Sequence, residues 1–186
     1  MTEKLSGAEK SMLFFLSADA IMTLTFFVVF AYLRFHAPRW PDAFHFGSGL
    51  MAVAMTMFLL AGSFTMFLAA RSTHDDAQAS TRWVAATVAS WCCFVLLEGM
   101  EWTRLIVIMG VTLQSNPWNI PLFGATYFIL TGLHALHVIA GLVYLTLVAM
   151  KKWDVRAARW YVHFVNAMWL PLFVGLYLAS TDLQGL

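Results

Sequence analysis

Long apolar stretches dominate the chain, and short polar segments separate them. Each stretch matches or exceeds the roughly 20 apolar residues that a helix needs to cross a membrane core of about 30 Å. Because lipid offers the backbone no hydrogen-bond partners, each stretch is expected to be helical. The pattern predicts five spans, over residues 12–33, 48–70, 83–109, 122–149 and 160–180.

These spans predict an all-α fold, an integral membrane bundle of five transmembrane helices. The connections are short, so neighbouring helices are expected to run antiparallel, and residues 1–186 are expected to form a single membrane domain. The second span comes closest to being apolar on all sides. Pro171 is the one proline inside a span, where it frees the carbonyl of Ala167 and predicts a kink.

The composition agrees with a membrane location. Hydrophobic residues make up 61% of the chain and charged residues only 11%, whereas a soluble domain has about 25% charged residues. The net charge of +1 provides no basic surface, so no nucleic-acid partner is expected. The two cysteines, Cys92 and Cys93, are adjacent and cannot easily close an unstrained disulfide. The chain is therefore expected to have neither a disulfide scaffold nor a thiolate zinc site.

The cationic residues gather on one side of the predicted membrane. Cytoplasmic loops carry the excess of lysine and arginine in membrane proteins, which places the N-terminus in the cytoplasm and the C-terminus outside. Tyr177 is then expected to mark the outer interface. The cytoplasmic group is Lys4, Lys10, Arg71, Arg82, Lys151, Lys152, Arg156 and Arg159, and the opposite loops hold only Arg34 and Arg39.

Several polar side chains fall within the spans or close to them. An ionisable group at membrane depth is costly, by at least about 2.5 kcal/mol, so each is a hypothesis of function with a partner to be found. No catalytic residue is expected among them. The candidate proton-accessible or structural polar residues are Asp19, Glu98, Glu101, His134, His137, His163 and Asn166.

Glu98 and Glu101 lie three residues apart and therefore share one face of a helix, with Arg104 at the next such step. One interpretation is a carboxylate pair that carries protons or contacts a partner subunit. The other is structural: Glu101 and Arg104 neutralise each other, and Glu98 is protonated or hydrogen-bonded. The spacing alone favours the structural interpretation.

His134 and His137 also share one face. Two such histidines either bind a metal or haem, or each bonds a neighbouring helix, which satisfies the donor and the acceptor of a neutral imidazole. Haem ligation usually needs histidines at matched depth. His163 lies only about 5 Å from the inner end of its span and His137 about 18 Å from that of its own. This mismatch in depth weakens the case for a shared haem. A haem-binding membrane cytochrome that uses His134, His137 and His163 is kept as an alternative.

Two further arrangements follow from depth. A di-metal site would use Glu98, Glu101, His134 and His137, but such sites in bundles usually combine Glu-x-x-His on one helix, and that motif is absent here. No metal is therefore expected in the chain. Asp19 and Asn166 lie at about 10 Å and about 9 Å depth from the same side. They are expected to form one cluster, which His137 also reaches within the error of the span boundaries.

Four blocks of sequence carry most of the polar residues named above. They read FGATYFILTGLHALHV at 123–138, WYVHFVNAMW at 160–169, LEGMEW at 97–102 and FLSAD at 15–19. Taken in order, they resemble subunit III of the haem-copper respiratory oxidases in its five-helix bacterial form. The first block is similar to the family's Thr-Gly-Phe-His-Gly-Leu-His-Val and the aromatic segment before it. The others resemble its Tyr-Trp-His-Phe-Val-Asp-x-x-Trp, Leu-Gln-x-x-Glu-Tyr and Phe-x-x-Ser-Glu.

The resemblance implies a subunit that packs against the catalytic subunits I and II and binds phospholipid. It also implies that the haem and copper reside in those partners and that this chain has no cofactor. Family members support proton uptake into the catalytic subunit and protect it from inactivation during turnover. Asp19 would be the membrane carboxylate, with His137 or His134 as its hydrogen-bond partner. Glu101 and His163 would be further matched polar positions.

The sequence also departs from the family pattern. Asp19 replaces the usual Glu, Asn166 replaces the usual Asp, and Glu98 stands where the family often has Gln. The predicted function is a non-redox subunit III of a proton-pumping terminal oxidase in the bacterial cytoplasmic membrane. The electron donor, cytochrome c or quinol, and membership of a larger respiratory supercomplex are left open. A five-span accessory protein of nitric oxide reductase is the other alternative.

Overall fold

The computed structural model describes residues 5–37, 40, 48–73 and 76–178. Lys4, Arg39 and the last two residues of the span predicted at 160–180 lie outside these ranges. The described chain contains five helices that are long and apolar enough to cross a membrane, which confirms the predicted all-α fold. They are α1 (Gly7–His36), α2 (Gly49–Ser72), α3 (Ala77–Thr103), α4 (Phe123–Ala149) and α5 (Val155–Leu172).

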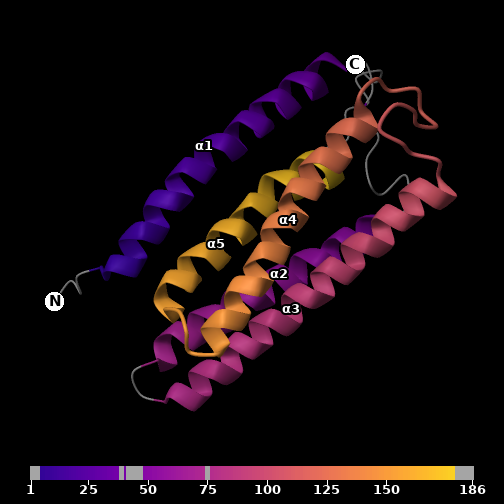
Figure 1. Cartoon of the computed structure of the whole chain (residues 1–186). Coiled ribbons are helices and arrows are strands. Elements are labelled where there is room, and N and C mark those ends of the chain that lie inside the picture. Colours follow the sequence, from indigo (N-terminus) through magenta and orange to yellow (C-terminus); the bar gives the residue numbers. More distant parts are fainter. Residues whose placement is uncertain (1–4, 38–39, 41–47, 74–75, 179–186) are drawn as a thin grey trace.

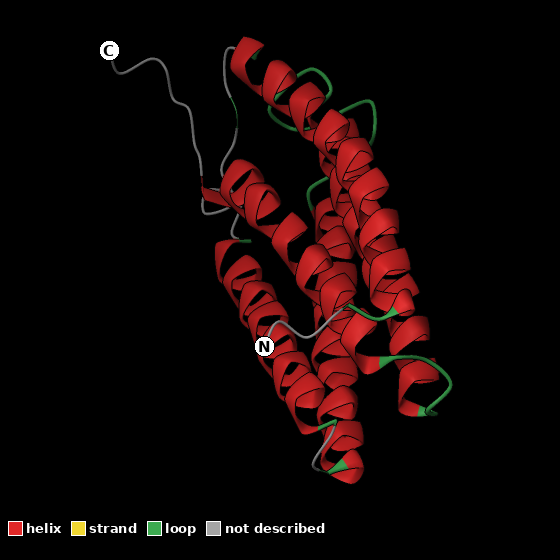
Figure 2. Ribbon diagram, turned by 90° about the vertical axis from the view of Figure 1, so that its left-hand side faces the viewer, coloured by secondary structure: helices red, strands yellow, loops and turns green. Residues whose placement is uncertain are grey.

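The helices run lengthwise beside one another in an elongated bundle (Figures 1 and 2). The widest contact joins α2 and α3, and α4 packs against α3. The central element is α5, which packs against α1, α2 and α4. As a result α1 lies at the edge of the bundle, on the side away from α2 and α3 (Figure 1).

One stripe of α1 faces the bundle, and most of the remaining surface is exposed. Large apolar side chains such as Phe14 and Phe35 point outward, with exposed fractions of 81% and 78%, as expected of a helix in contact with lipid. The buried positions recur every three, four, seven or ten residues and therefore share one face. Four of these six residues are polar or charged: Glu9, Leu16, Asp19, Thr23, Phe30 and Arg34.

Side chains cap the starts of three helices. Ser6 and Glu9 form a capping box at α1, in which Glu9 accepts from the Ser6 amide at 2.9 Å. Asp76 accepts two backbone N–H bonds in the first turn of α3, at 2.8 and 2.9 Å. Asp154 accepts one in the first turn of α5, at 2.7 Å. Such caps satisfy amides that have no partner within the helix, so these three starts are encoded locally.

A tryptophan fills the middle of the bundle. Trp91 of α3 is fully buried, and its ring lies against Gly62 of α2 and Gly141 of α4. A β-carbon on Gly62 would lie 3.0 Å from this ring, and one on Gly141 would overlap it. Glycine at both positions therefore allows α3 to approach its two neighbours closely, as small residues do in membrane bundles.

Two helices end in a wider turn. After α3 the chain continues as the π-helix η1 (Arg104–Ile108), and after α5 as η2 (Phe173–Leu178). The helix does not stop at Pro171, but its hydrogen-bond pattern changes from α to π two residues later. Single π turns often occur at functional positions, and η2 carries Tyr177, which faces the buried carboxylates described below.

Candidate functional site: an aspartate–histidine pair inside the bundle

Asp19 of α1 and His137 of α4 meet across the bundle. The His137 Nε2 atom lies 3.0 Å from Asp19 Oδ2 and 3.2 Å from Oδ1. The two side chains are only 12% and 6% exposed for His137 and Asp19, respectively. The pair therefore joins the edge helix to the centre of the bundle through one buried acid–base contact.

The hydrogen bonds of His137 limit the protonation states of this pair. Its Nδ1 atom lies 2.7 Å from the carbonyl of Leu133, and a carbonyl only accepts, so Nδ1 carries a hydrogen. The contact between Nε2 and Asp19 then needs one more proton. Either that proton lies on Nε2, giving an ion pair, or it lies on the carboxyl, giving a neutral pair. The contact thus holds one exchangeable proton in either of two positions.

Tyr161 of α5 contacts the backbone of α4 at His137. Its hydroxyl donates to the backbone carbonyl of His137 at 2.9 Å. This bond fixes the segment of α4 that carries the imidazole relative to α5. Three helices therefore determine the position of the pair: α1 through Asp19, α4 through His137 and α5 through Tyr161.

The two ends of α1 are also held by polar contacts. The Ser6 hydroxyl lies 3.5 Å from Asp154 at the start of α5. At the other end the Arg34 guanidinium donates to the carbonyl of Gly175 at 3.0 Å, and it lies over the ring of Trp40. The Asp19–His137 contact therefore lies between polar contacts at the two ends of the helix.

Asn166 does not join Asp19, so the predicted cluster of these two residues is wrong. The Asn166 amide donates to the carbonyl of Leu59 at 2.8 Å and to the hydroxyl of Ser63 at 2.7 Å, both on α2. His163 also contacts Ser63, at 3.3 Å. The prediction compared only the membrane depths of Asp19 and Asn166. The rotation of α5 about its axis turns Asn166 towards α2 and away from α1.

Polar contacts continue along the α2–α5 interface. The Trp169 indole N–H donates to the Thr56 hydroxyl at 2.8 Å. The second span, which appeared the most uniformly apolar, therefore supplies two hydroxyl partners that the sequence analysis missed. Serine and threonine give little warning of such a role, because they bond their own helix as well: Thr56 donates to Ala52, at 2.8 Å.

His134 bonds a neighbouring helix and does not contact Asp19. Its Nε2 atom donates to the carbonyl of Val165 at 3.1 Å, and the ring is completely buried between Phe94 and Trp169. Of the two histidines proposed for Asp19, the structure thus selects His137. In the described ranges, no three histidine, cysteine or acidic side chains gather into a group able to hold a metal ion.

Glu98 and Glu101 lie in a second buried site, near the end of α3. They are 3% and 0% exposed. Glu101 Oε2 accepts from the Tyr177 hydroxyl at 3.3 Å, and that hydroxyl lies 2.7 Å from the hydroxyl of Tyr127. Tyr177 is fully buried within the bundle, and its predicted depth at the outer membrane interface stays a prediction. Its contact with Glu101 was missed.

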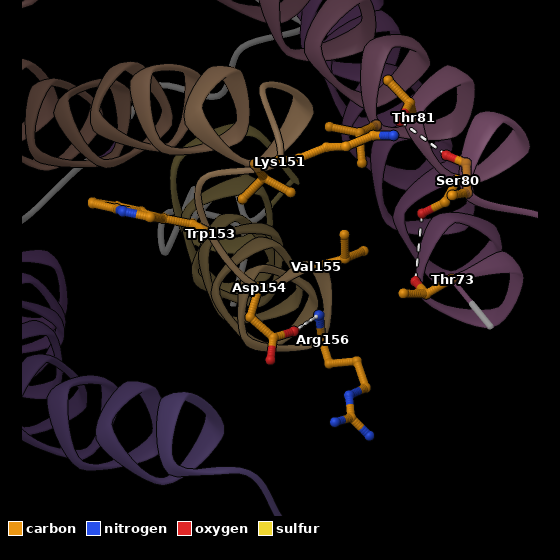
Figure 3. A pocket seen from close by; sticks show the side chains of 11 residues that line it. Thr73, Ser80, Thr81, Lys151, Trp153, Asp154, Val155 and Arg156 are labelled. Carbon is orange, nitrogen blue, oxygen red and sulfur yellow. Dashed lines mark hydrogen bonds between the residues drawn. The ribbon is translucent and has the colours of Figure 1, made fainter.

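A cavity of about 440 Å³ opens where the α2–α3 and α4–α5 connections meet. Figure 3 shows Lys151 and Asp154 of the α4–α5 connection beside it, together with Thr73 at the end of α2 and Ser80 and Thr81 in the first turns of α3. Two helices begin beside it, but Asp76 and Asp154 already accept from their first amides. The two capping carboxylates beside the cavity are therefore already engaged, and its charged lining residues are Lys151, Asp154 and Arg156.

The fold and the site together define a class of protein: a multi-pass membrane bundle whose helices are joined by buried acid–base and hydroxyl contacts. No family model matches the chain. The probable cytochrome c oxidase subunit 3 of Mycobacterium leprae is 31% identical over 150 residues, covering 75% of this chain and 71% of the relative. The chain therefore belongs to the cytochrome c oxidase subunit III family.

Other relatives carry the same name. The cytochrome c oxidase subunit 3 of Corynebacterium diphtheriae is 29% identical over 149 residues, covering 74% of this chain and 70% of the relative. That of Oncorhynchus mykiss is 28% identical over 192 aligned positions, covering 92% and 69%. The family membership predicted from the four sequence blocks is thus confirmed.

Proposed function

We propose that this chain is subunit III of a respiratory terminal oxidase that reduces oxygen to water and pumps protons. In this role it packs against subunits I and II, which carry the haem and copper, and it holds no redox centre itself. The name of its relatives supports a place in such a complex. The buried contact between Asp19 and His137 is the observation that carries the mechanism.

The mechanism of this chain is proton exchange at the Asp19–His137 pair. The pair holds one proton between two partners, and transfer of that proton between Asp19 and His137 leaves the net charge of the pair at zero. A proton taken up on one side and a proton released on the other restore the same neutral state, so no isolated charge stays in the membrane. Asp19 lies on α1, at the edge of the bundle. This placement supports proton access to the pair from a neighbouring subunit or from the membrane surface. We place this pair beside the proton-uptake side of the catalytic subunit.

Phospholipid binding is a second part of the proposal. Two grooves lie between α1 and α4, one on each side of the Asp19–His137 contact. The outer groove, of about 220 Å³, is almost wholly apolar and suits an acyl chain; it includes Phe26, Val29, Leu130 and Ile129. The inner groove, of about 460 Å³, has Met12 and Phe15 on its wall and Lys152 on its rim, which suits a chain below an anionic headgroup.

The orientation and location complete the proposal. We place residues 1–186 as one membrane domain in the cytoplasmic membrane of a bacterium, with the N-terminus inside. The cations on the proposed inner side support this placement, among them Lys10, Arg71, Arg82 and Lys151. Of the seven polar residues predicted from the sequence, Asp19 and His137 then form the proton-exchanging pair, and His134, His163 and Asn166 make structural contacts between helices.

Replacing Asp19 by alanine in the assembled oxidase tests the proposal. We expect the variant complex to retain its haem content but to take up protons more slowly, or to inactivate after fewer turnovers. Ser17→Ala is the matched control, because Ser17 is exposed on the same helix and bonds only its own backbone among the described residues. Loss of haem from the Asp19→Ala complex, or turnover and proton uptake equal to the control, would contradict the proposal.

A further inference from the structure

A second site of buried carboxyls lies towards the other end of the bundle from the Asp19–His137 pair. Tyr127, which belongs to it, precedes His137 by ten residues on α4, or about 15 Å along the helix. Both carboxyl oxygens of Glu98 lack a hydrogen-bond partner among the described side chains and backbone, and so does one oxygen of Glu101. The other Glu101 oxygen accepts from Tyr177. Three carboxyl oxygens are therefore buried without a donor, an arrangement that an ionised pair would find very costly.

The groups beside Glu98 offer it acceptors and no free donor. Thr131 and Trp102 are polar neighbours of its carboxyl. The Trp102 indole N–H donates to the Thr131 hydroxyl at 3.1 Å, and that hydroxyl donates to the carbonyl of Tyr127 at 2.8 Å. Both hydrogens are thus committed elsewhere, and a lone pair of the Thr131 oxygen is left. Only a protonated carboxyl makes use of such surroundings.

The groups around Glu101 have the opposite polarity. The Tyr177 hydroxyl donates to Glu101, so the hydroxyl of Tyr127 must donate to the oxygen of Tyr177. The two hydroxyls then form a chain that ends with the Tyr177 O–H donated to Glu101. The buried Ser48 hydroxyl is also close to this carboxyl and has no other partner among the described residues, and the charge of Arg104 is near. Glu101 is therefore surrounded by donors and a cation, which suit a carboxylate.

We propose that Glu98 and Glu101 form a proton-binding site in which the Glu98 carboxyl holds the proton and Glu101 is the anion. Its ligand is the proton, exchanged with water or hydronium. Among the residues that the structure describes, the titratable groups that face the site are Arg104 beside α3, Tyr127 on α4 and Tyr177 on η2; Ser48 and Thr131 are neutral. A single cation balances one carboxylate but not two, so the second carboxyl stays neutral in the low-dielectric interior.

Infrared spectroscopy of the full chain tests this site independently of any role in an oxidase. A protonated carboxyl gives a C=O stretching band that shifts in D₂O. At neutral pH we expect Glu98→Gln to remove one such band from the wild-type spectrum, and Glu101→Gln, one helical turn away, to retain it. Retention of every band in Glu98→Gln, or loss of this band in Glu101→Gln alone, would overturn the proposal.

The test does not depend on the variants folding. If Glu98→Gln does not accumulate, the wild-type chain is compared in H₂O and D₂O at neutral and alkaline pH. The proposal requires a carboxylic C=O band at neutral pH that weakens only in alkali, and a spectrum without one overturns it. If the expected infrared band is present while Asp19→Ala leaves turnover and proton uptake unchanged, the proton-binding site stands and the proposed oxidase function fails. The two proposals are thus tested separately.

Discussion

The Tyr161 hydroxyl donates to the backbone carbonyl of His137, the residue whose ring contacts Asp19. One hydrogen bond thus connects the central helix to the site through the main chain of α4. Because the bond reaches the backbone, it holds the position of the imidazole without altering which protons the imidazole carries. Support and proton exchange are therefore separated at this site, and mutations can test them one at a time.

Tyr161→Phe is expected to lower the stability of the bundle by about 1 kcal/mol, the typical net value of one hydrogen bond. The ring, which packs edge-on against Tyr144, is retained. Thermal unfolding in detergent measures the effect. Tyr144→Phe is the control and should change stability less, and equal losses from the two variants would contradict a specific role for the bond to His137.

The Asp19–His137 contact should appear as energetic coupling. Asp19→Ala and His137→Ala each leave the other side chain buried without its partner, whereas the double variant removes both. The double variant is therefore expected to be less destabilised than the sum of the single changes, by about 0.5–3 kcal/mol. Unfolding of all four proteins measures this coupling, and strictly additive losses would show that the contact contributes nothing.

Asn166→Asp restores the residue that the resemblance leads one to expect, and we predict that it destabilises this chain. The Asn166 amide donates to Leu59 and Ser63. A carboxylate has no hydrogen to donate and places a charge beside the Leu59 carbonyl, so a loss of about 2 kcal/mol or more is expected. Asn166→Leu, which also removes the donors but adds no charge, should lose less. Unfolding temperatures that rank the two variants in the reverse order would refute this explanation.

The glycine at the centre of the bundle should not tolerate a side chain. Gly141→Ala places a methyl group against Trp91 and Tyr161, and overpacking of this kind typically costs about 1–3 kcal/mol. Gly99→Ala is a matched control within another helix, since nothing lies within 4 Å of its added β-carbon. Helix propensity should make that control neutral or slightly stabilising. Equal destabilisation of both variants would argue against the close approach at Trp91.

The cap at the start of α3 predicts a pH dependence. Backbone hydrogen bonds from Ala79 and Gln78 lower the pKa of Asp76 below its usual value of 3.8. A carboxyl whose pKa is lower in the folded state stabilises that state above its unfolded pKa, and this contribution disappears as the pH falls through the folded pKa. Asp76→Asn keeps an acceptor without titrating, so the variant should lose less stability below about pH 4. Unfolding temperatures across the acid range measure the difference, and parallel curves would contradict it.

The sequence predicted the five helices because apolar length alone determines membrane spans. An acid at membrane depth needs a partner; the resemblance to subunit III implied a histidine of the fourth span for Asp19, whereas depth alone grouped Asp19 mainly with Asn166. The sequence did not determine whether His134 or His137 would be that partner. This choice depends on how each helix is rotated about its axis, and the nearly uniform apolar surface leaves that rotation to the packing of residues such as Trp91 and Gly141.

The tyrosines of the second site were unpredictable for a different reason. A tyrosine near the end of a span is equally typical of a membrane interface and of a buried hydrogen bond. Tyr177 takes the second role because the wide turn of η2 brings it to Glu101. A π-helix has no clear sequence signal, so neither the turn nor the contact could be read from the chain.

The polar stripe of α1 has a consequence for biogenesis. This helix leaves the ribosome before α4 and α5, yet its main packing partner is α5 and its central attachment is on α4. During synthesis α1 therefore lies in the bilayer without the His137 partner of Asp19 and without its packing surface on α5 until α4 and α5 are inserted. The packing of α1 against α4 and α5 is therefore the step that completes the bundle. A chain truncated before α4 is expected to be a target for membrane quality control.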